Sequence, residues 1–468
     1  MSPGPVVLKF GGTSVADAEA IGRLVRHVGA AHRRARAVVV VSALSGITDR
    51  LLHLAAAAAA ADEAAVAAGL DELQQRHDAV AHQAAPDSAA LRVRIAADVA
   101  ELRNLLHAIG TLKDPSPRTR DAVAAFGELL SSRIVEAACQ AAGLPAVWID
   151  PRRVLITNDT FGCALPSMEE TTAAVTAYLQ PLIAAGHVPV TGGYVGATPS
   201  GVTTTLGRGG SDYSAAILGA ALDASEIQIW TDVDGMMTAD PRVVASTHVV
   251  PRLSFEEASE LAYFGAKVLH PSTILPAVSK NIPVRILNSR RFDGGGTLIT
   301  SSSPPRINDE PLAALACKRH ITVVDITSTR MLMAHGFLRR VFEVFERCRT
   351  PIDVISTSEV SISVTIDDAS RLEMLVGELS AFAEVRVEHD MAILCAVGDG
   401  LRRDPRLATR ILGSLERFPL RMVSQAASRR NVTVVLQDSV AGAAMNHLHE
   451  RFFARAVAPT QVGTGLAS

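Results

Sequence analysis

Aromatic residues are scarce in this chain, and it has no long apolar run. Phe, Trp and Tyr make up only 4% of its 468 residues. No apolar stretch approaches the roughly 18 residues that a membrane-spanning helix needs. The N-terminus also lacks the charged and then apolar segments of a secretion signal. We therefore expect a cytoplasmic protein that has no membrane partner.

The chain also lacks a strong excess of either charge, and its cysteines are not clustered. The formal net charge is −3, which gives no overall field to attract nucleic acid, so we expect no nucleic-acid partner. The five cysteines are widely spaced and form no CxxC pair: Cys139, Cys163, Cys317, Cys348 and Cys395. This pattern predicts reduced thiols and no set of metal-ligating residues.

Residues 1–300 alternate between strand-like and helical patterns. An apolar strand over 6–10 precedes Gly11 and Gly12, a helical pattern follows, and a second apolar, β-branched run covers 37–43. Strand, glycine turn, helix and strand in this order predict a βαβ unit. Because the alternation continues to about residue 300, we expect one large three-layer α/β domain with a mostly parallel sheet.

The pattern changes after the Gly-rich and Ser-Pro-rich segments at 293–305. Shorter strands are predicted at 321–326, 360–366, 391–397 and 432–436, with helices at 337–348 and 407–417. The order βαββαβ occurs once near 318–390 and approximately again near 391–455. We therefore expect two small α+β modules in tandem. Modules of this kind pair their sheets, so we also expect oligomers.

The segment 204–214, TTLGRGGSDYS, has the composition of an anion-binding turn. Its glycines let backbone N–H groups approach a ligand, and the helix that follows supplies unpaired donors at its start. Arg208 offers a planar fork for a carboxylate or a phosphate, and Asp212 lies where a helix tolerates negative charge. Taken alone, the segment is equally consistent with a loop in which Ser211 or Asp212 caps a helix.

A second turn of this kind lies near the N-terminus. Lys9 is predicted at the end of a strand, directly before Gly11 and Gly12. Ligands bind at the carboxyl ends of the strands in such sheets. A lysine beside backbone donors there can neutralise a transferring phosphoryl group. Two such turns in one chain favour a role for Lys9 in phosphoryl transfer over the alternative that it is a surface lysine at a strand end.

Five segments carry a resemblance to a known family. They are KFGGTSV at 9–15, TTLGRGGSD at 204–212, WTDVDG at 230–235, TADPR at 238–242 and FGAKVLHPS at 264–272. In this order they resemble the signature segments of aspartate kinases, members of the amino-acid kinase superfamily. The similarity extends from about residue 6 to about 453. Beyond the kinase part, the C-terminal modules resemble paired ACT domains, which bind amino-acid effectors.

The resemblance implies the domain organisation and the activity. It implies an amino-acid kinase fold over 1–300, a linker over 301–311, and two ferredoxin-like ACT domains over 312–390 and 391–468. The implied reaction is Mg²⁺-dependent transfer of the ATP γ-phosphoryl group to the β-carboxylate of L-aspartate. This is the first step of lysine, threonine and methionine biosynthesis. The resemblance also implies a homodimer or homotetramer formed through the ACT domains.

The resemblance also assigns site residues. Lys9 would hold the transferring phosphoryl group, and Asp212 would keep the charged groups of the site in position. Arg208 suits the α-carboxylate of aspartate, and Glu128 suits its ammonium. The implied substrate-binding residues are Ser42, Thr48, Glu128, Arg208, Gly209, Gly210 and Ser211. The implied ATP-binding residues are Lys9, Gly11, Gly12, Thr231, Asp232, Met237, Arg242, Lys267 and Val268.

An effector amino acid is implied at the first ACT module, with lysine favoured. The implied residues are Met331, Ala334, Gly336, Phe337, Leu338, Asp353, Ser358 and Glu359. Backbone donors near Gly336 suit a carboxylate, and Asp353 or Glu359 suits an ammonium. Ala334 and Pro351 replace hydroxyl side chains of the lysine-inhibited relatives, so the identity of the effector stays open.

Two other functions remain open at this point. One is a related carboxylate or carbamate kinase, against which the Glu128 and Arg208 pair and the ACT-like modules argue. The other is an amino-acid sensor without catalysis, against which the retained charges of Lys9, Asp212 and Arg208 argue. Because a carboxylate acceptor is already ionised at neutral pH, we expect no catalytic His or Cys.

Overall fold

The computed structural model describes residues 4–265, 271–302, 311–328, 336–425 and 429–453. It forms two compact units that are not contiguous in sequence. The first contains Met1–Met236, Val249–Ala262 and Lys267–Ser303, and the second contains Met237–His248, Tyr263–Ala266 and Pro304–Ser468. The segments 237–248 and 263–265 therefore belong to the C-terminal unit. No helix among the described residues is long and apolar enough to cross a membrane.

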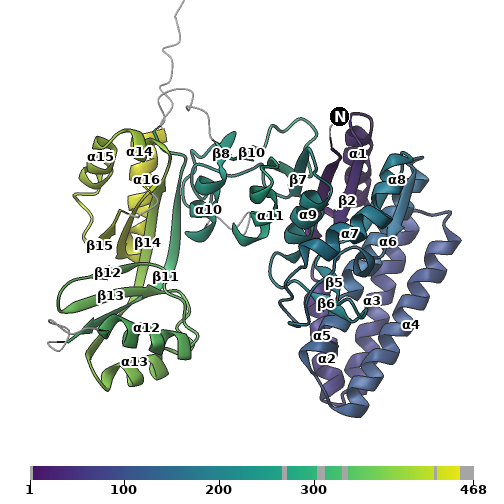
Figure 1. The fold of residues 1–468 in the computed structure, drawn as a ribbon, viewed down its shortest axis with the longest axis horizontal. Helices are drawn as coiled ribbons and strands as arrows, with labels where there is room; N and C mark the ends of the chain where they lie inside the picture. The colour runs from purple at the N-terminus through teal and green to yellow at the C-terminus, as the bar shows by residue number, and fades with distance from the viewer. Residues whose placement is uncertain (1–3, 266–270, 303–310, 329–335, 426–428, 454–468) are drawn as a thin grey trace, which may run out of the picture. The chain divides into compact units, whose positions relative to one another are not determined.

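The first unit is built on an eight-stranded sheet with the order β3-β4-β2-β1-β7-β9-β10-β8. Its strands are β1 (Val6–Phe10), β2 (Ala37–Val41), β3 (Ala146–Ile149), β4 (Val188–Gly192), β7 (Glu226–Thr231), β8 (Arg252–Ser254), β9 (Val284–Asn288) and β10 (Thr297–Thr300). Within this sheet, the neighbouring strands β3, β4, β2, β1, β7 and β9 are parallel to one another. Strand β10 runs antiparallel to β9. This confirms the predicted α/β class with a mostly parallel sheet. Figure 1 shows β2, β7, β8 and β10 of this sheet among its helices.

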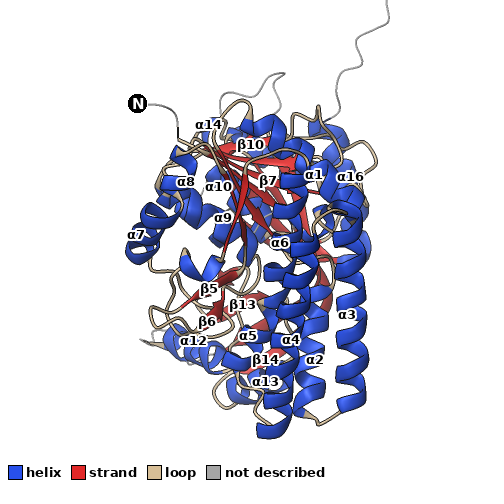
Figure 2. Ribbon diagram, turned by 90° about the vertical axis from the view of Figure 1, so that its right-hand side faces the viewer, coloured by secondary structure: helices blue, strands red, loops and turns tan. Residues whose placement is uncertain are grey.

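Helices cover both faces of this sheet, and further helices pack against those. They are α1 (Ala18–His32), α2 (Ile47–Ala59), α3 (Glu63–Ala84), α4 (Ala89–Leu112), α5 (Pro117–Ala124), α6 (Phe126–Ala141), α7 (Met168–Tyr178), α8 (Gln180–Ala184), α9 (Gly210–Ala221), α10 (Phe255–Tyr263) and α11 (Leu275–Ser279). Figure 2 shows α9 on the opposite side of the sheet from α6, and the long helices α2, α3 and α4 side by side. The small hairpin of β5 (Val195–Ala197) and β6 (Thr203–Thr205) lies outside the main sheet.

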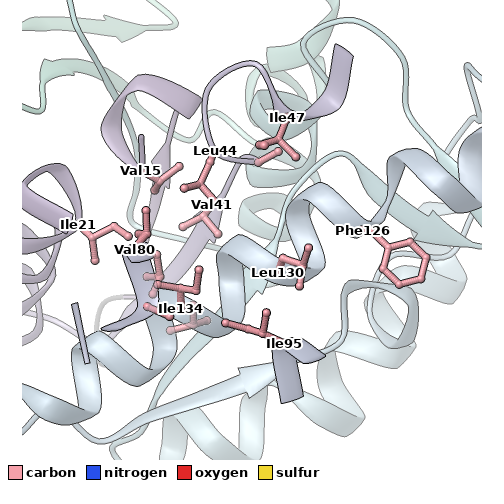
Figure 3. Close-up of a cluster of buried hydrophobic side chains, with 14 of the residues drawn as sticks. Val15, Ile21, Val41, Leu44, Ile47, Val80, Ile95, Phe126, Leu130 and Ile134 are labelled. Carbon is pink, nitrogen blue, oxygen red and sulfur yellow. The ribbon is translucent and has the colours of Figure 1, made fainter. Parts of the chain in front are cut away.

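The main core of this unit lies between the sheet and the helices on the α6 side. Figure 3 shows part of it, with Val41 of β2 near Ile21 of α1, Val80 of α3, Ile95 of α4 and Ile134 of α6. Because β1 and β2 are buried on both faces, they are apolar nearly throughout, and β2 reads AVVVV. Lys9 interrupts the apolar run of β1, so its burial calls for a specific partner.

The second unit is built on a six-stranded antiparallel sheet with the order β12-β13-β11-β14-β16-β15. Its strands are β11 (Ala314–Thr327), β12 (Ile355–Thr357), β13 (Ser361–Ile366), β14 (Glu384–Val397), β15 (Leu420–Ser424) and β16 (Asn431–Gln437). Its helices are α12 (Phe337–Arg347), α13 (Leu372–Ser380), α14 (Gly400–Arg403), α15 (Arg406–Ser414) and α16 (Asp438–Phe453).

The two modules of this unit share their central strands, unlike a simple tandem repeat. Residues 314–318 of β11 pair with 393–397 of β14, whereas residues 322–327 pair with β13 and with the first part of β14. The second module therefore takes its fourth strand from the segment that precedes the first module. A register shift after Lys318, with positive φ at His320 and Asp390, marks the change between modules. The boundary that the sequence predicts at 390/391 thus falls inside the single strand β14.

Candidate active site

A cavity of about 750 Å³ opens at the carboxyl ends of four parallel strands in the first unit. The register aligns Phe10 of β1 with Val41 of β2 and Trp230 of β7, and Val41 with Gly192 of β4. The turns that leave these strands therefore start at one edge of the sheet. This is where parallel α/β sheets bind their ligands.

Lys9 and Asp212 form an ion pair in the wall of this cavity. Lys9 is the penultimate residue of β1, and Asp212 lies in the first turn of α9, 203 positions later in the chain. The Lys9 Nζ–Asp212 Oδ1 distance is 2.6 Å, and the two side chains are 10% and 15% exposed. The pair supplies the partner that a lysine in a buried strand requires. It also leaves the cationic group at the cavity, where a ligand can reach it.

The backbone of α9 begins at the same cavity. Gly209 precedes the helix with φ of 69°, a left-handed conformation that side chains disfavour. At Gly210 an added Cβ would lie 2.6 Å from Cδ2 of Tyr194, so the helix start needs a residue without a side chain. The first N–H groups of α9 and its positive dipole end therefore stand beside Lys9. Such a site stabilises phosphate or carboxylate oxygens.

Glu128 is a buried carboxyl group in the first turn of α6, and it lines the cavity. Its Oε1 accepts a hydrogen bond from the Ala43 N–H at 3.2 Å. Its Oε2 is buried and has no hydrogen-bond partner among the described residues. Burial raises the pKa of Glu128 to about 8, although the charge of Lys9 acts in the opposite direction. A buried carboxyl oxygen without a partner is expected to accept a hydrogen bond from a ligand.

The cavity brings together most of the residues that the sequence predicts for substrate and ATP. Those that line it are Lys9, Gly11, Gly12, Ser42, Thr48, Glu128, Arg208, Gly209, Gly210, Ser211, Asp212, Thr231 and Asp232. Met237 and Arg242 belong to the second unit, where Arg242 pairs with Asp240 at 2.7 Å. Lys267 and Val268 lie outside the described residues.

The predicted effector residues lie in the second unit or outside the described residues. Met331 and Ala334 are outside. Gly336, with φ of 85°, precedes α12, and Phe337 and Leu338 begin that helix. Ser358 and Glu359 lie in the turn between β12 and β13, where the Ser358 hydroxyl bonds the Ser361 hydroxyl at 2.7 Å.

Asp353 already has a cationic partner within the second unit. Its Oδ1 lies 2.7 Å from Nζ of Lys318, which also contacts Asp367 at 2.7 Å. The Asp353 side chain is only 5% exposed, and burial raises the pKa of its carboxyl group, with Lys318 acting in the opposite direction. An incoming ammonium group would therefore compete with Lys318 for this carboxylate.

Asp121 is a residue near the site that the sequence analysis missed. This buried carboxylate of α5 accepts the Gly162 N–H at 2.9 Å, the Thr205 N–H at 2.9 Å and the Thr205 hydroxyl at 2.8 Å. Gly162 lines the cavity, and its carbonyl oxygen would lie 3.2 Å from a Cβ added at Gly207. Asp121 thus fixes the loop that supports the Arg208 turn. No local pattern distinguishes it from a solvated helix charge.

Replacing Asp121 with Asn is expected to weaken this support. The Asn side chain would turn an NH₂ donor toward at least one of the three N–H and O–H donors that bond to Asp121. Each lost hydrogen bond to a charged group costs about 1.5–3 kcal/mol. We expect a lower Tm and a higher KM for the substrate that Arg208 binds. Steady-state kinetics and thermal melts would measure both, with the exposed Asp159→Asn on the neighbouring loop as a control. Equal Tm and KM values in the two variants would contradict the role given to Asp121.

Family models place the fold and the site in a known class. The amino acid kinase family matches residues 4–288, and an ACT domain matches residues 394–452. The first match covers the strands and turns that form the cavity. The chain is therefore an ATP-dependent kinase of the amino acid kinase family with a C-terminal ACT region.

Similar proteins narrow this class further. The lysine-sensitive aspartokinase 3 of Escherichia coli is 36% identical over 96% of this chain and 99% of its own length. The chloroplastic aspartokinase 3 of Arabidopsis thaliana is 36% identical over 96% of this chain and 81% of its own length. The crystal structure of E. coli aspartokinase III with lysine and aspartate superposes with a TM-score of 0.81, at 36% identity, over 96% and 99% of the two chains. The chain belongs to the aspartokinases, as its sequence motifs predict.

Proposed function

We propose that this protein transfers the γ-phosphoryl group of ATP to the β-carboxylate of L-aspartate, giving 4-phospho-L-aspartate and ADP. The observation that carries this proposal is the Lys9–Asp212 pair, which lies beside the start of α9 in one cavity with Glu128 and Arg208. A further support is the E. coli aspartokinase III structure with aspartate and ADP, which has a TM-score of 0.81 to this chain. The reaction is the first step toward lysine, threonine and methionine.

The two sides of the cavity suit the two substrates. Arg208 and the turn 209–211 offer donors for the α-carboxylate of aspartate, and Glu128 offers an acceptor for its ammonium group. Ser42 and Thr48 also line the cavity and add hydroxyl groups. Gly11 and Gly12 face the phosphates, while Thr231, which ends β7, and Asp232 after it face the rest of the nucleotide. Met237, Arg242, Lys267 and Val268 stay predicted nucleotide contacts.

The geometry accounts for the chemistry without a general base. A β-carboxylate oxygen, already ionised at neutral pH, attacks the γ-phosphorus as the bond to the β–γ bridging oxygen breaks and ADP leaves. Lys9 and the N–H groups of α9 stabilise the negative charge on the transferring oxygens. Asp212 holds the Lys9 ammonium in place at 2.6 Å. Catalysis therefore rests on positioning and charge stabilisation.

An ATP-dependent kinase uses a divalent cation, which we propose is Mg²⁺. The described residues contain no group of three His, Cys, Asp or Glu side chains that could hold a metal by themselves. Mg²⁺ fits such a site, because it takes one or two carboxylates together with phosphate oxygens and water. Asp232 is a carboxylate in the cavity wall that would complete its ligands. When bound, the ion neutralises charge on the phosphates.

We further propose an oligomer that binds lysine as feedback inhibitor at the first ACT module. Large apolar side chains are exposed on α12 and on the β12–β13 hairpin: Leu338, Phe342, Ile355 and Val360. Strand β12 lies at the edge of its sheet and is exposed. An exposed edge strand beside exposed apolar residues favours pairing with a second copy, as a homodimer or homotetramer. Several residues predicted for the effector, including Phe337 and Ser358, come from these same segments.

We place the reaction in the cytoplasm. None of the five cysteines, all of which lie within the described residues, forms a disulfide, and three of them are buried. Free thiols of this number are typical of a reducing compartment.

The experiment that tests this function measures hydroxamate formation from the acyl phosphate in the presence of hydroxylamine. Purified protein, ATP and Mg²⁺ would be combined with aspartate, glutamate or no acceptor, and with lysine, threonine or methionine. We expect product with aspartate only, and inhibition by lysine. Hydroxamate with glutamate instead would support another carboxylate kinase. Thermal stabilisation by an amino acid, with no hydroxamate from any acceptor, would support an amino-acid sensor.

A further inference from the structure

Behind the nucleotide side of the cavity, three distant segments meet at Ser289. This residue follows β9 and does not line the cavity. Its N–H donates to the Thr231 carbonyl at 2.8 Å, and its hydroxyl accepts a hydrogen bond from the Ser14 hydroxyl at 2.8 Å. Its carbonyl oxygen lies 3.0 Å from Nε2 of His27. The N–H, hydroxyl and carbonyl groups of the buried Ser289 are therefore all hydrogen-bonded, each to a different segment of the chain.

Two of these segments lead directly to the cavity. Ser14 ends the short helix that begins at Gly12, and its N–H donates to the Gly11 carbonyl at 2.9 Å. Thr231 itself lines the cavity. The two segments also meet where the Gly11 N–H donates to the Trp230 carbonyl at 3.1 Å. Ser289 thus ties the turn predicted for the phosphates to the turn predicted for the rest of the nucleotide.

His27 is the third residue that forms a hydrogen bond with Ser289. Its ring lies between Trp230 and Phe292, with ring-centroid distances of 4.0 and 4.2 Å, and is 4% exposed. Burial lowers its pKa, the bond to Ser289 acts in the opposite direction, and the charges of Arg26 and Arg23 lower it further. The imidazole is therefore neutral at pH 7. Because its Nε2 faces a carbonyl oxygen, Nε2 carries the proton and donates it.

We propose that Ser289 is a positioning residue for phosphoryl transfer, which with Ser14 and His27 fixes the spacing between the Gly11–Gly12 turn and the Thr231–Asp232 turn. This proposal rests on the proposed binding of ATP across these two turns. In-line transfer is sensitive to such spacing, since a misplacement of ~1 Å can cost ~10²-fold in rate. The aspartate side depends on Glu128 and Arg208, which lie on other elements.

The test is Ser289→Ala, which deletes one hydroxyl and leaves both backbone bonds of Ser289 in place. We expect kcat/KM for ATP to fall by about 10-fold or more, with KM for aspartate changed less than about 2-fold. Ser14→Ala should give a similar result. The double variant should lose little more than either single one, because the two hydroxyls bond to each other.

The matched control is Ser132→Ala. Ser132 is fully buried in the same unit, donates to the Leu129 carbonyl at 3.1 Å and accepts from Trp148 Nε1 at 2.9 Å. It does not line the cavity. We expect it to lower Tm at least as much as Ser289→Ala does and to leave kcat/KM for ATP unchanged. A similar loss of kcat/KM for ATP in this control would overturn the proposal.

Two other outcomes would also overturn it. One is an unchanged kcat/KM for ATP in Ser289→Ala, and the other is a loss shared equally between the two substrates. Calorimetric titration with ADP distinguishes failure of this proposal from failure of the proposed kinase function. If the wild-type protein gives no hydroxamate, the proposed function fails, and ADP affinity then decides. Weaker ADP binding by Ser289→Ala than by Ser132→Ala supports the positioning role, and equal or undetectable binding refutes it.

Discussion

Replacing Lys9 with Ala is expected to lower kcat by about 10²–10³-fold, the usual cost of removing one group that stabilises transition-state charge. The KM values should change far less, because Gly11, Gly12 and the start of α9 still bind the ground-state phosphates. Hydroxamate kinetics at saturating ATP would measure the loss. Near-normal kcat in this variant would remove Lys9 from the proposed chemistry.

The control for Lys9→Ala is a second lysine that pairs with an aspartate in the same unit. Lys280 lies 3.0 Å from Asp223, and both side chains are largely exposed, so Lys280→Ala should leave kcat unchanged.

The buried pair of Lys9 and Asp212 allows a sharper test. Lys9→Ala leaves the Asp212 carboxylate facing the phosphates without a counter-charge, and Asp212→Asn added to it removes that repulsion. The double variant should therefore be more active than the sum of the two single losses predicts.

The sequence was informative where local pattern and function coincide. The apolar strands, the glycine turns after β1 and before α9, and the alternation of strand and helix predicted the α/β class. Parallel strands end at one edge, so residues as distant as Gly11, Ser42 and Asp232 could be expected at one site. The structure places them in one cavity.

The sequence was uninformative where a residue acts through long-range hydrogen bonds. Asp121 contacts Thr205, 84 positions away, and Ser14 contacts Ser289, 275 positions away. Asp121 and Ser289 are single polar residues outside the five resembling segments, so neither creates a periodic pattern or a motif. Only the folded chain shows that its partners lead to the cavity.

Strand sharing in the second unit has a similar cause. Hydrophobic pattern predicts that a segment is a strand, but it does not specify the neighbour with which the strand pairs. The first part of β11 has the apolar sequence Ala314-Leu315-Ala316-Cys317, which suits either module. In the fold it pairs with β14, and Leu315 packs in the core formed with α15 and α16.

Glu128→Gln tests the aspartate side of the cavity and is expected to have the second-largest effect. The amide keeps the size of the side chain but removes the charge that faces the substrate ammonium. Losing one partner of a buried charge pair costs about 2–5 kcal/mol. At pH 8 and above, we therefore expect KM for aspartate to rise by about 100-fold, with KM for ATP little changed. The control is Glu136→Gln, a partly buried carboxyl group on the same helix that does not line the cavity.

The pH dependence of KM supplies a signature that a loss of structure would not reproduce. Burial raises the pKa of Glu128 to about 8, so below this pH the Glu128 carboxyl group is mostly protonated before aspartate binds. Only the carboxylate attracts an ammonium group, and its fraction falls about tenfold per pH unit below the pKa. KM for aspartate in the wild-type protein should therefore fall as the pH rises from 6 to 8. The Glu128→Gln variant should show no such fall, because it has no proton to lose. A parallel pH dependence in both proteins would mean that another group controls aspartate binding, and it would remove the ammonium contact from Glu128.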